Sequence, residues 1–150
     1  MPISMAYIDE VWPNTGFQYF IEENGEKISS FTSPHLYSLK HRFWLKDRFI
    51  TIKELKKNIK IIKKLKIKLT LFELLNLVYY ISAAKLKNIS YGLVEAGLLF
   101  AGDSTNVWNE PKCQIVTNIN KQHLEWVKPP TLHEICRQKV GFLSKKTTIY

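Results

Sequence analysis

The stretch PPTLHEICRQKV (Pro129–Val140), near the C-terminal end, organises the interpretation of the sequence. Apolar residues recur here and just beyond it at intervals of three and four, which places them on one face of a helix. They are Leu132, Ile135, Cys136, Val140 and Leu143. Proline is excluded from a helix interior, so the helix begins after Pro130, with Thr131 as N-cap and Glu134 completing a capping box. The spacing predicts one short helix.

The same residues resemble the BC-box, the helix by which adaptor proteins dock onto Elongin C. The family's core is a small hydroxyl residue and Leu, three spacers, Cys, three spacers and an aliphatic residue. Thr131, Leu132, Cys136 and Val140 match that core. Pro129 and Arg137 extend the match to the SOCS-box form of ankyrin-repeat and SOCS-box proteins.

This resemblance implies that Leu132 anchors in an apolar pocket of Elongin C, while the small Cys136 lets the helix approach closely. The implied partner-binding residues are Thr131, Leu132, Ile135, Cys136, Val140 and Leu143. Gly141 stands where the family usually continues with Arg, and no Leu-Pro-Leu-Pro-like segment for cullin selection follows. Recruitment of a cullin is therefore open, and the alternative is an ordinary amphipathic helix packed on its own domain.

Composition favours one folded, intracellular domain. The chain has 150 residues, 45% of them hydrophobic, and two cysteines, which is too few for a disulfide framework. The N-terminal residues do not form a secretory signal, and no apolar run reaches the roughly 18 residues that cross a bilayer. We expect a cytoplasmic or nuclear protein with a helical body over residues 1–126 and a SOCS/BC-box-like segment over 127–150.

Helix signals dominate the body. Thr51 with Glu54 and Thr70 with Glu73 are capping boxes that each open a helix. Residues 17–28 indicate either a hairpin at Asn24-Gly25 or a helix ending there, and the acidic residues favour the helix. Further helices are expected over 35–49 and 89–97. The predicted fold class is mainly α, made of paired helices, with a weak resemblance to a degenerate ankyrin unit around residues 70–97.

Positive charge is concentrated in one run. The net charge is +9, and eight lysines lie between Lys53 and Lys68. The alternative function is therefore a small basic helical protein that binds nucleic acid or anionic membrane through Lys53–Lys68. The run contains neither arginine nor interleaved aromatic residues, which favours a solvated helix face instead.

Catalytic motifs are missing from the sequence. It contains no Gly-rich phosphate loop, no Gly-x-Ser-x-Gly and no His-Glu-x-x-His. A zinc set is chemically conceivable, but its spacing matches no common finger. Its members would be Cys113, His123, His133 and Cys136. We therefore expect a non-catalytic adaptor without cofactor or metal, which recruits an unknown client protein to an Elongin B/C ubiquitin ligase.

Overall fold

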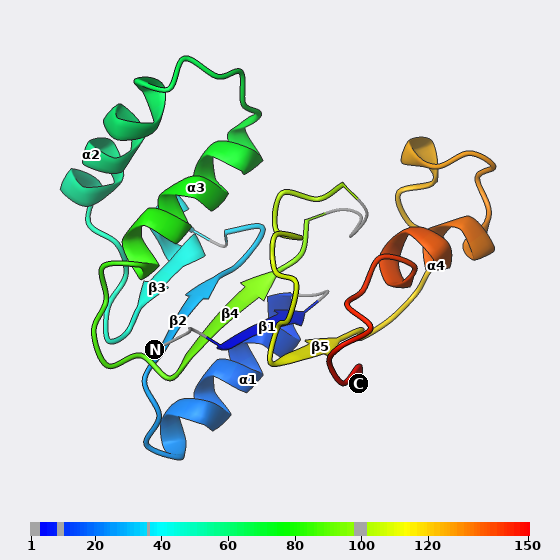
Figure 1. Cartoon of the computed structure of the whole chain (residues 1–150), viewed down its shortest axis with the longest axis horizontal. Helices are drawn as coiled ribbons and strands as arrows, with labels where there is room; N and C mark the ends of the chain where they lie inside the picture. Colours follow the sequence, from blue (N-terminus) through cyan, green and yellow to red (C-terminus); the bar gives the residue numbers. More distant parts are fainter. Residues whose placement is uncertain (1–3, 9–10, 36, 98–101) are drawn as a thin grey trace.

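A twisted, mostly parallel sheet forms the centre of the molecule (Figure 1). The computed structural model describes residues 4–8, 11–35, 37–97 and 102–150, and side chains from residue 16 onward within these ranges. In these ranges the sheet has five strands in the order β3-β2-β4-β1-β5. Their bounds are β1 Ser4–Ile8, β2 Ile28–Phe31, β3 Phe43–Leu45, β4 Tyr91–Glu95 and β5 Cys113–Ile115. Strand β3 runs antiparallel to β2, and the other neighbours are parallel.

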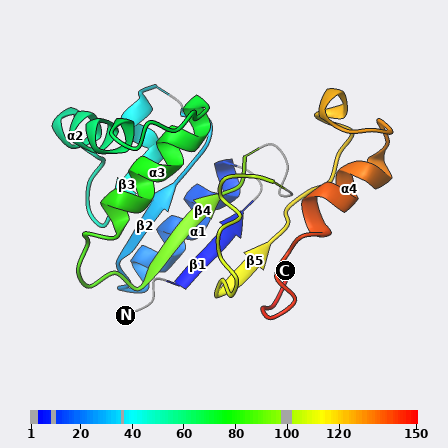
Figure 2. The ribbon, with the colours of Figure 1, turned by 45° about the horizontal axis from the view of Figure 1, so that its top comes forward.

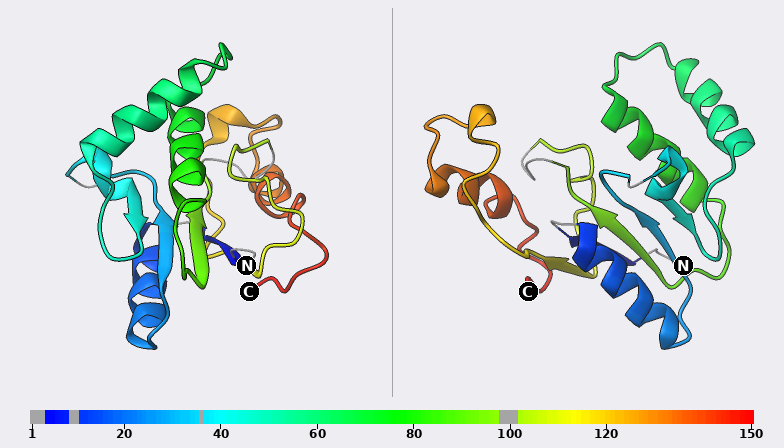
Figure 3. Two further views of the ribbon diagram at one scale, coloured as in Figure 1. Left: turned by 60° about the vertical axis from the view of Figure 1, so that its left-hand side comes forward. Right: turned by 180° about the vertical axis from the view of Figure 1, so that it is seen from behind.

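Helices cover both faces of this sheet (Figures 2 and 3). Helix α1 (Val11–Glu23) packs on one face, against β1, β2 and β4. Helix α3 (Leu71–Ala83) packs on the other face, and α2 (Ile52–Lys63) lies against α3. Helix α4 (Leu132–Val140) and the short 3-10 turn η2 (Leu124–Trp126) lie beyond β5, while a second such turn, η1 (Leu39–Arg42), precedes β3.

Helices α2 and α3 begin where the sequence predicts. Thr51 and Thr70 each accept a hydrogen bond from the backbone N–H three residues on, at 3.2 Å. Glu54 and Glu73 reach back to the backbone N–H of the two threonines at 2.9 and 2.6 Å. Both capping boxes are therefore confirmed, because each satisfies donors that a helix N-terminus leaves unpaired.

The main core lies between the sheet and the α2–α3 layer. Phe31 and Phe43, from β2 and β3, are fully buried, and their ring centroids are 5.6 Å apart. Tyr79 of α3 is also buried, with its ring centroid 5.7 Å from that of Phe31. A smaller cluster on the α1 face contains Ile28 and Leu93. These contacts hold α1 and α3 on opposite faces of one sheet.

The C-terminal segment is fastened to the edge strand β5. The buried Gln114 side chain donates to the Ser144 carbonyl at 3.0 Å and to Thr147 Oγ1 at 2.7 Å. Backbone bonds between Gln114 and residues 148 and 150 continue the parallel pattern of the sheet. Residues 148–150 thus cover the outer side of β5.

The mainly α prediction is wrong, because the described part of the chain combines helices with a sheet. Residues 35–49 contain η1 and β3 rather than one helix, and Tyr91–Glu95 is a strand at the centre of the sheet. With β4 between two parallel partners, the ankyrin-like pairing of helices is also wrong. The helix expected to end at Asn24-Gly25 is confirmed, because α1 ends at Glu23 and Gly25 follows with φ +82°.

Candidate functional site

The carboxyl ends of three adjacent parallel strands meet at one edge of the sheet. Strands β2, β4 and β1 end at Phe31, Glu95 and Ile8, and the register pairs Phe31 with Val94 and Ile8 with Glu95. In open α/β sheets, ligands bind outside the carboxyl ends of the strands. The antiparallel strand β3 begins at the same edge, directly after Arg42, with Phe43 opposite Phe31. We call this end of the sheet the carboxyl edge, and define it by Ser33, Arg42, Glu95 and Asp103.

Glu95 is the central acidic group of the carboxyl edge. It is the last residue of β4, with 3% of its surface exposed. Its Oε2 accepts the backbone N–H of Ser33 at 2.8 Å, which ties the end of β4 to the segment leaving β2. A buried carboxylate needs hydrogen bonds or a positive charge to offset its lost hydration. Glu95 therefore lies in a site organised around a negative charge.

Arg42 brings positive charge to the same place. Its NH1 donates to Ser33 Oγ at 3.1 Å, and its Nε donates to His35 Nδ1 at 3.2 Å. Burial lowers the pKa of Arg42 from its usual value, and the charge of Glu95 acts in the opposite direction. The guanidinium remains charged at neutral pH, so Ser33 lies between an anionic and a cationic side chain.

The loop after β4 is held by Asp103. Its Oδ2 accepts the Gly97 N–H at 2.8 Å, and its Oδ1 accepts the N–H and the hydroxyl of Thr105, both at 2.9 Å. Burial raises the pKa of Asp103, while these three hydrogen bonds act to lower it. A Cβ on Gly97 would lie 2.4 Å from Asp103 Oδ2, so only glycine allows this close approach.

Helix α3, which lies on the face of the sheet opposite α1, also supports the loop after β4. Asn76, which is buried, donates through Nδ2 to Ser104 Oγ at 2.7 Å. Its Oδ1 is also buried and has no hydrogen-bond partner among the described residues. Buried polar atoms are normally paired, so α3 retains one unsatisfied acceptor, Asn76 Oδ1, beside the loop at 103–105.

The residues predicted to bind Elongin C lie in and beside α4, beyond the edge strand β5 (Figure 1). Thr131 is the N-cap and accepts the Glu134 N–H at 3.2 Å. Leu132 is 42% exposed and Cys136 is half-buried, but Ile135 is fully buried. Val140 and Leu143 pack with Ala96 in a small cluster of the chain's own interior. Much of the predicted docking face is therefore already covered.

Metal ligands do not gather in the pattern considered from the sequence. Cys113 lies in β5, His123 precedes η2, and His133 and Cys136 lie in α4. Across residues 4–8, 11–35, 37–97 and 102–150, no group of three or more His, Cys, Asp or Glu side chains could hold a metal ion. Of the helices that the structure describes, none combines the length and apolar character needed to cross a bilayer.

A parallel sheet with helices on both faces and a polar carboxyl edge is the architecture of ligand-binding α/β domains. Several solved structures share it. Escherichia coli FolC in complex with ADP matches with a TM-score of 0.83 and 22% identity over 99% of this chain. A bifunctional folylpolyglutamate synthase/dihydrofolate synthase with Mn, AMPPNP and L-glutamate bound matches with a TM-score of 0.83 and 19% identity over 97% of this chain. Folylpolyglutamate synthase from Thermotoga maritima matches with a TM-score of 0.78 and 19% identity over 99% of this chain.

The chain spans 37% of each of these three structures. At this level of identity, the likeness establishes the fold. No protein-family model matches the chain, and no curated protein matches it either.

These matches overturn the functional interpretation of the sequence. The structures that share the fold are folylpolyglutamate synthases, so the SOCS-box and ankyrin resemblance is wrong, and so are Elongin B/C and a cullin as partners. The expectation of a non-catalytic adaptor is contradicted as well, because the matching proteins are enzymes. Binding of nucleic acid or anionic membrane through Lys53–Lys68 gains no support from these matches. The division of the chain at residue 126 and its cytoplasmic or nuclear location stay predictions.

Sequence reasoning missed all four residues of the carboxyl edge. Ser33 lies just before the helix expected over 35–49, and Glu95 lies within the helix expected over 89–97. One signal was available for Glu95, since it directly follows the short apolar run Leu93-Val94, as a polar residue often does where a buried strand reaches the sheet edge. Ser33 and Arg42 carry no comparable local signal.

Proposed function

We propose that this chain forms the cation-binding core of a ligase similar to folylpolyglutamate synthase, an enzyme that by its name adds glutamate to folates. The observation that carries the proposal is the buried Glu95 carboxylate at the end of β4, hydrogen-bonded to Ser33 at 2.8 Å. It occupies the edge where α/β folds bind ligands. A structure with the same fold has Mn and L-glutamate bound.

The residues present fit a hard divalent cation. Mg²⁺ and Mn²⁺ prefer oxygen ligands, and Mg²⁺ sites often use only one or two protein carboxylates, with water completing the coordination. The Glu95 carboxylate and the Ser33 hydroxyl are such oxygens, and they belong to segments joined by a hydrogen bond. With so few charged ligands, we expect a dissociation constant on the order of 10⁻⁴–10⁻³ M.

Arg42 gives the site a second role. Folates and glutamate carry carboxylates, and a guanidinium binds a carboxylate through two parallel hydrogen bonds. Arg42 is positioned by Ser33 and His35, next to the carboxylate of Glu95. The proposed enzyme would therefore use Glu95 for the cation and Arg42 to orient an acidic substrate.

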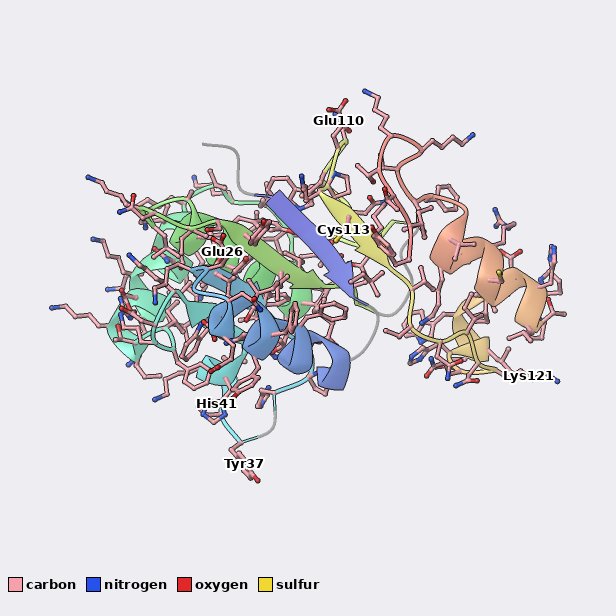
Figure 4. All side chains as sticks on the ribbon, turned by 90° about the horizontal axis from the view of Figure 1, so that it is seen from below. Glu26, Tyr37, His41, Glu110, Cys113 and Lys121 are labelled. Atoms are coloured by element: carbon pink, nitrogen blue, oxygen red, sulfur yellow. The ribbon has the colours of Figure 1, made fainter. Side chains whose placement is uncertain are left out.

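Binding of Mn²⁺ to the full chain tests the proposal. The electron paramagnetic resonance signal of free Mn²⁺ should fall as wild-type protein is added, and Glu95→Gln should weaken binding at least tenfold. Glu110→Gln is the matched control, because Glu110 is an exposed residue paired with Lys146 just before β5, far from His41 and its neighbour Arg42 (Figure 4). Far-UV circular dichroism confirms that both variants fold. If the wild type binds no Mn²⁺ up to several millimolar, or if Glu95→Gln binds it equally well, the proposal fails.

A further inference from the structure

The outer face of helix α1 exposes aromatic side chains. Phe17, Tyr19 and Phe20 are between 40% and 68% exposed, whereas Ile21 of the same helix packs inward, on the smaller cluster of the α1 face. Glu23 is also exposed and lies one turn beyond Tyr19 and Phe20. Three acidic residues and no basic one lie between positions 16 and 26. We call Phe17, Tyr19, Phe20 and Glu23 the aromatic face, which combines exposed rings with negative charge.

A second exposed apolar surface lies where α2 is joined to α3. Four aliphatic side chains there are between 42% and 67% exposed. They are Ile61, Leu65, Ile67 and Leu71. The lysines among them are exposed too, namely Lys63, Lys64, Lys66 and Lys68. No acidic residue lies between Glu54 and Glu73. We call residues 61–71 the basic tip, a surface that combines exposed aliphatic side chains with positive charge.

The aromatic face and the basic tip cannot meet within one molecule. Helix α1 packs on one face of the sheet, and α2 packs on α3, which covers the other face (Figure 3). The two surfaces are nevertheless complementary. Aliphatic groups and lysine stems can cover aromatic rings, and ammonium groups are attracted both to the faces of the rings and to carboxylates. The surface that each one lacks in its own molecule is therefore available on a second copy.

We propose that the aromatic face of one copy of this chain docks on the basic tip of another. Charge selects this pairing, because two basic tips, or two acidic α1 faces, would oppose like charges. The two surfaces differ and lie on opposite sides of the sheet, so each bound pair keeps one free aromatic face and one free basic tip. Association therefore continues beyond a dimer as the protein concentration rises. It does not depend on the cation site at Glu95, so a failure to bind Mn²⁺ would leave it intact.

Sedimentation velocity of the full chain tests the proposal. At low ionic strength, the weight-average sedimentation coefficient should rise steadily between micromolar and millimolar protein, past the value of a dimer. Salt at about 0.5 M should remove most of this rise, because it shortens the range of attraction between exposed charges to a few ångströms.

Two charge-reversed variants test the pairing itself. One carries Glu23→Lys and Glu26→Lys, which reverse two of the three acidic charges on the α1 side. The other reverses all four lysines of the basic tip, by Lys63→Glu, Lys64→Glu, Lys66→Glu and Lys68→Glu. Each variant alone should stay monomeric, because its two surfaces then carry charge of the same sign. An equimolar mixture should associate as the wild type does, since the basic α1 side of the first variant meets the acidic tip of the second.

The matched control reverses four exposed lysines elsewhere, which lowers the net charge by the same amount as the tip variant. It carries Lys112→Glu, Lys121→Glu, Lys128→Glu and Lys145→Glu. This control should associate at least as strongly as the wild type, and far-UV circular dichroism confirms that every variant folds. A wild type that stays monomeric at millimolar concentration and low salt overturns the proposal and leaves the basic tip to a different acidic partner. An equal loss of association in the control, or a mixture of the two variants that stays monomeric, also overturns it.

Discussion

The contact between Gly97 and Asp103 yields the sharpest prediction about stability. An alanine at position 97 would place its Cβ 2.4 Å from Asp103 Oδ2 and 2.9 Å from Phe72 Cε1. The Phe72 ring packs on the main core, with its centroid 5.9 Å from that of Phe31, so it has little freedom to withdraw. Asp103 must then move, which strains its hydrogen bonds to Gly97 and Thr105.

Overpacking costs about 1–3 kcal/mol. Each weakened hydrogen bond to the Asp103 carboxylate costs at most about a further 1.5–3 kcal/mol. Because the loop can relax in part, we expect Gly97→Ala to lower the free energy of unfolding by about 2–4 kcal/mol. Urea denaturation measures this change. With a slope of about 2 kcal/mol per molar, the midpoint should fall by about 1–2 M.

Gly16→Ala is the matched control. Gly16 lies inside α1, and a Cβ there would meet nothing within 4 Å. Alanine restricts the unfolded chain more than glycine does, so this variant should gain about 0.5–1 kcal/mol. The reasoning about the loop after β4 is wrong if Gly97→Ala leaves the urea midpoint unchanged or raises it while Gly16→Ala shows the expected gain in stability.

Two further predictions concern the sheet and the start of α2. Tyr79→Phe removes a hydroxyl 3.0 Å from Ser29 Oγ, both groups being buried, and should lower the free energy of unfolding by about 1–2 kcal/mol. The double variant Tyr79→Phe with Ser29→Ala should lose less stability than the sum of the losses in the two single variants, because both substitutions remove the same hydrogen bond. Additive losses in thermal melts would contradict a direct bond between the two hydroxyls. Hydrogen bonds from Arg48 and then Thr51 lower the pKa of Glu54 from 4.5 to about 2. This carboxylate therefore stabilises the fold above pH 4.5 and loses that effect as the pH falls towards 2, so Glu54→Gln should narrow the stability difference between pH 5 and pH 3. The Arg48–Glu54 pair is exposed, which limits its contribution to the free energy of unfolding to about 1 kcal/mol. If the stability of Glu54→Gln depends on pH as that of the wild type does, the prediction is wrong.

Local signals in the sequence predicted helices α2, α3 and α4, because the capping residues that mark a helix start lie within four positions of one another, whereas the helices expected over 35–49 and 89–97 are wrong. Thr51 and Thr70 open α2 and α3 as expected. Thr131 caps α4, but the Glu134 carboxylate turns to Arg137, at 2.7 and 2.6 Å, instead of closing the box. The helices were therefore found, even where the detail of the cap differed.

The strands were missed because their evidence is not local. Strand β2 contains Ser29 and Ser30, which are buried, so the hydrophobic period expected of a strand is absent. Strand β4 is a short apolar run, and periodicity cannot distinguish such a run from a buried helix segment. Its partner β1 precedes it by more than eighty positions, with Ser4 opposite Tyr91. The carboxyl edge exists only once these distant strands pair, which is why the sequence did not reveal it.

The way Gln114 fastens the C-terminal residues bears on how copies of this protein behave in concentrated solution. A bare β-edge invites pairing with another molecule and, from there, aggregation. Residues 148–150 occupy that position along β5, and the Gln114 side chain holds the segment before them in place. Gln114→Ala would loosen this cover and leave an open strand, so light scattering should detect growing assemblies at protein concentrations where the wild type stays monodisperse.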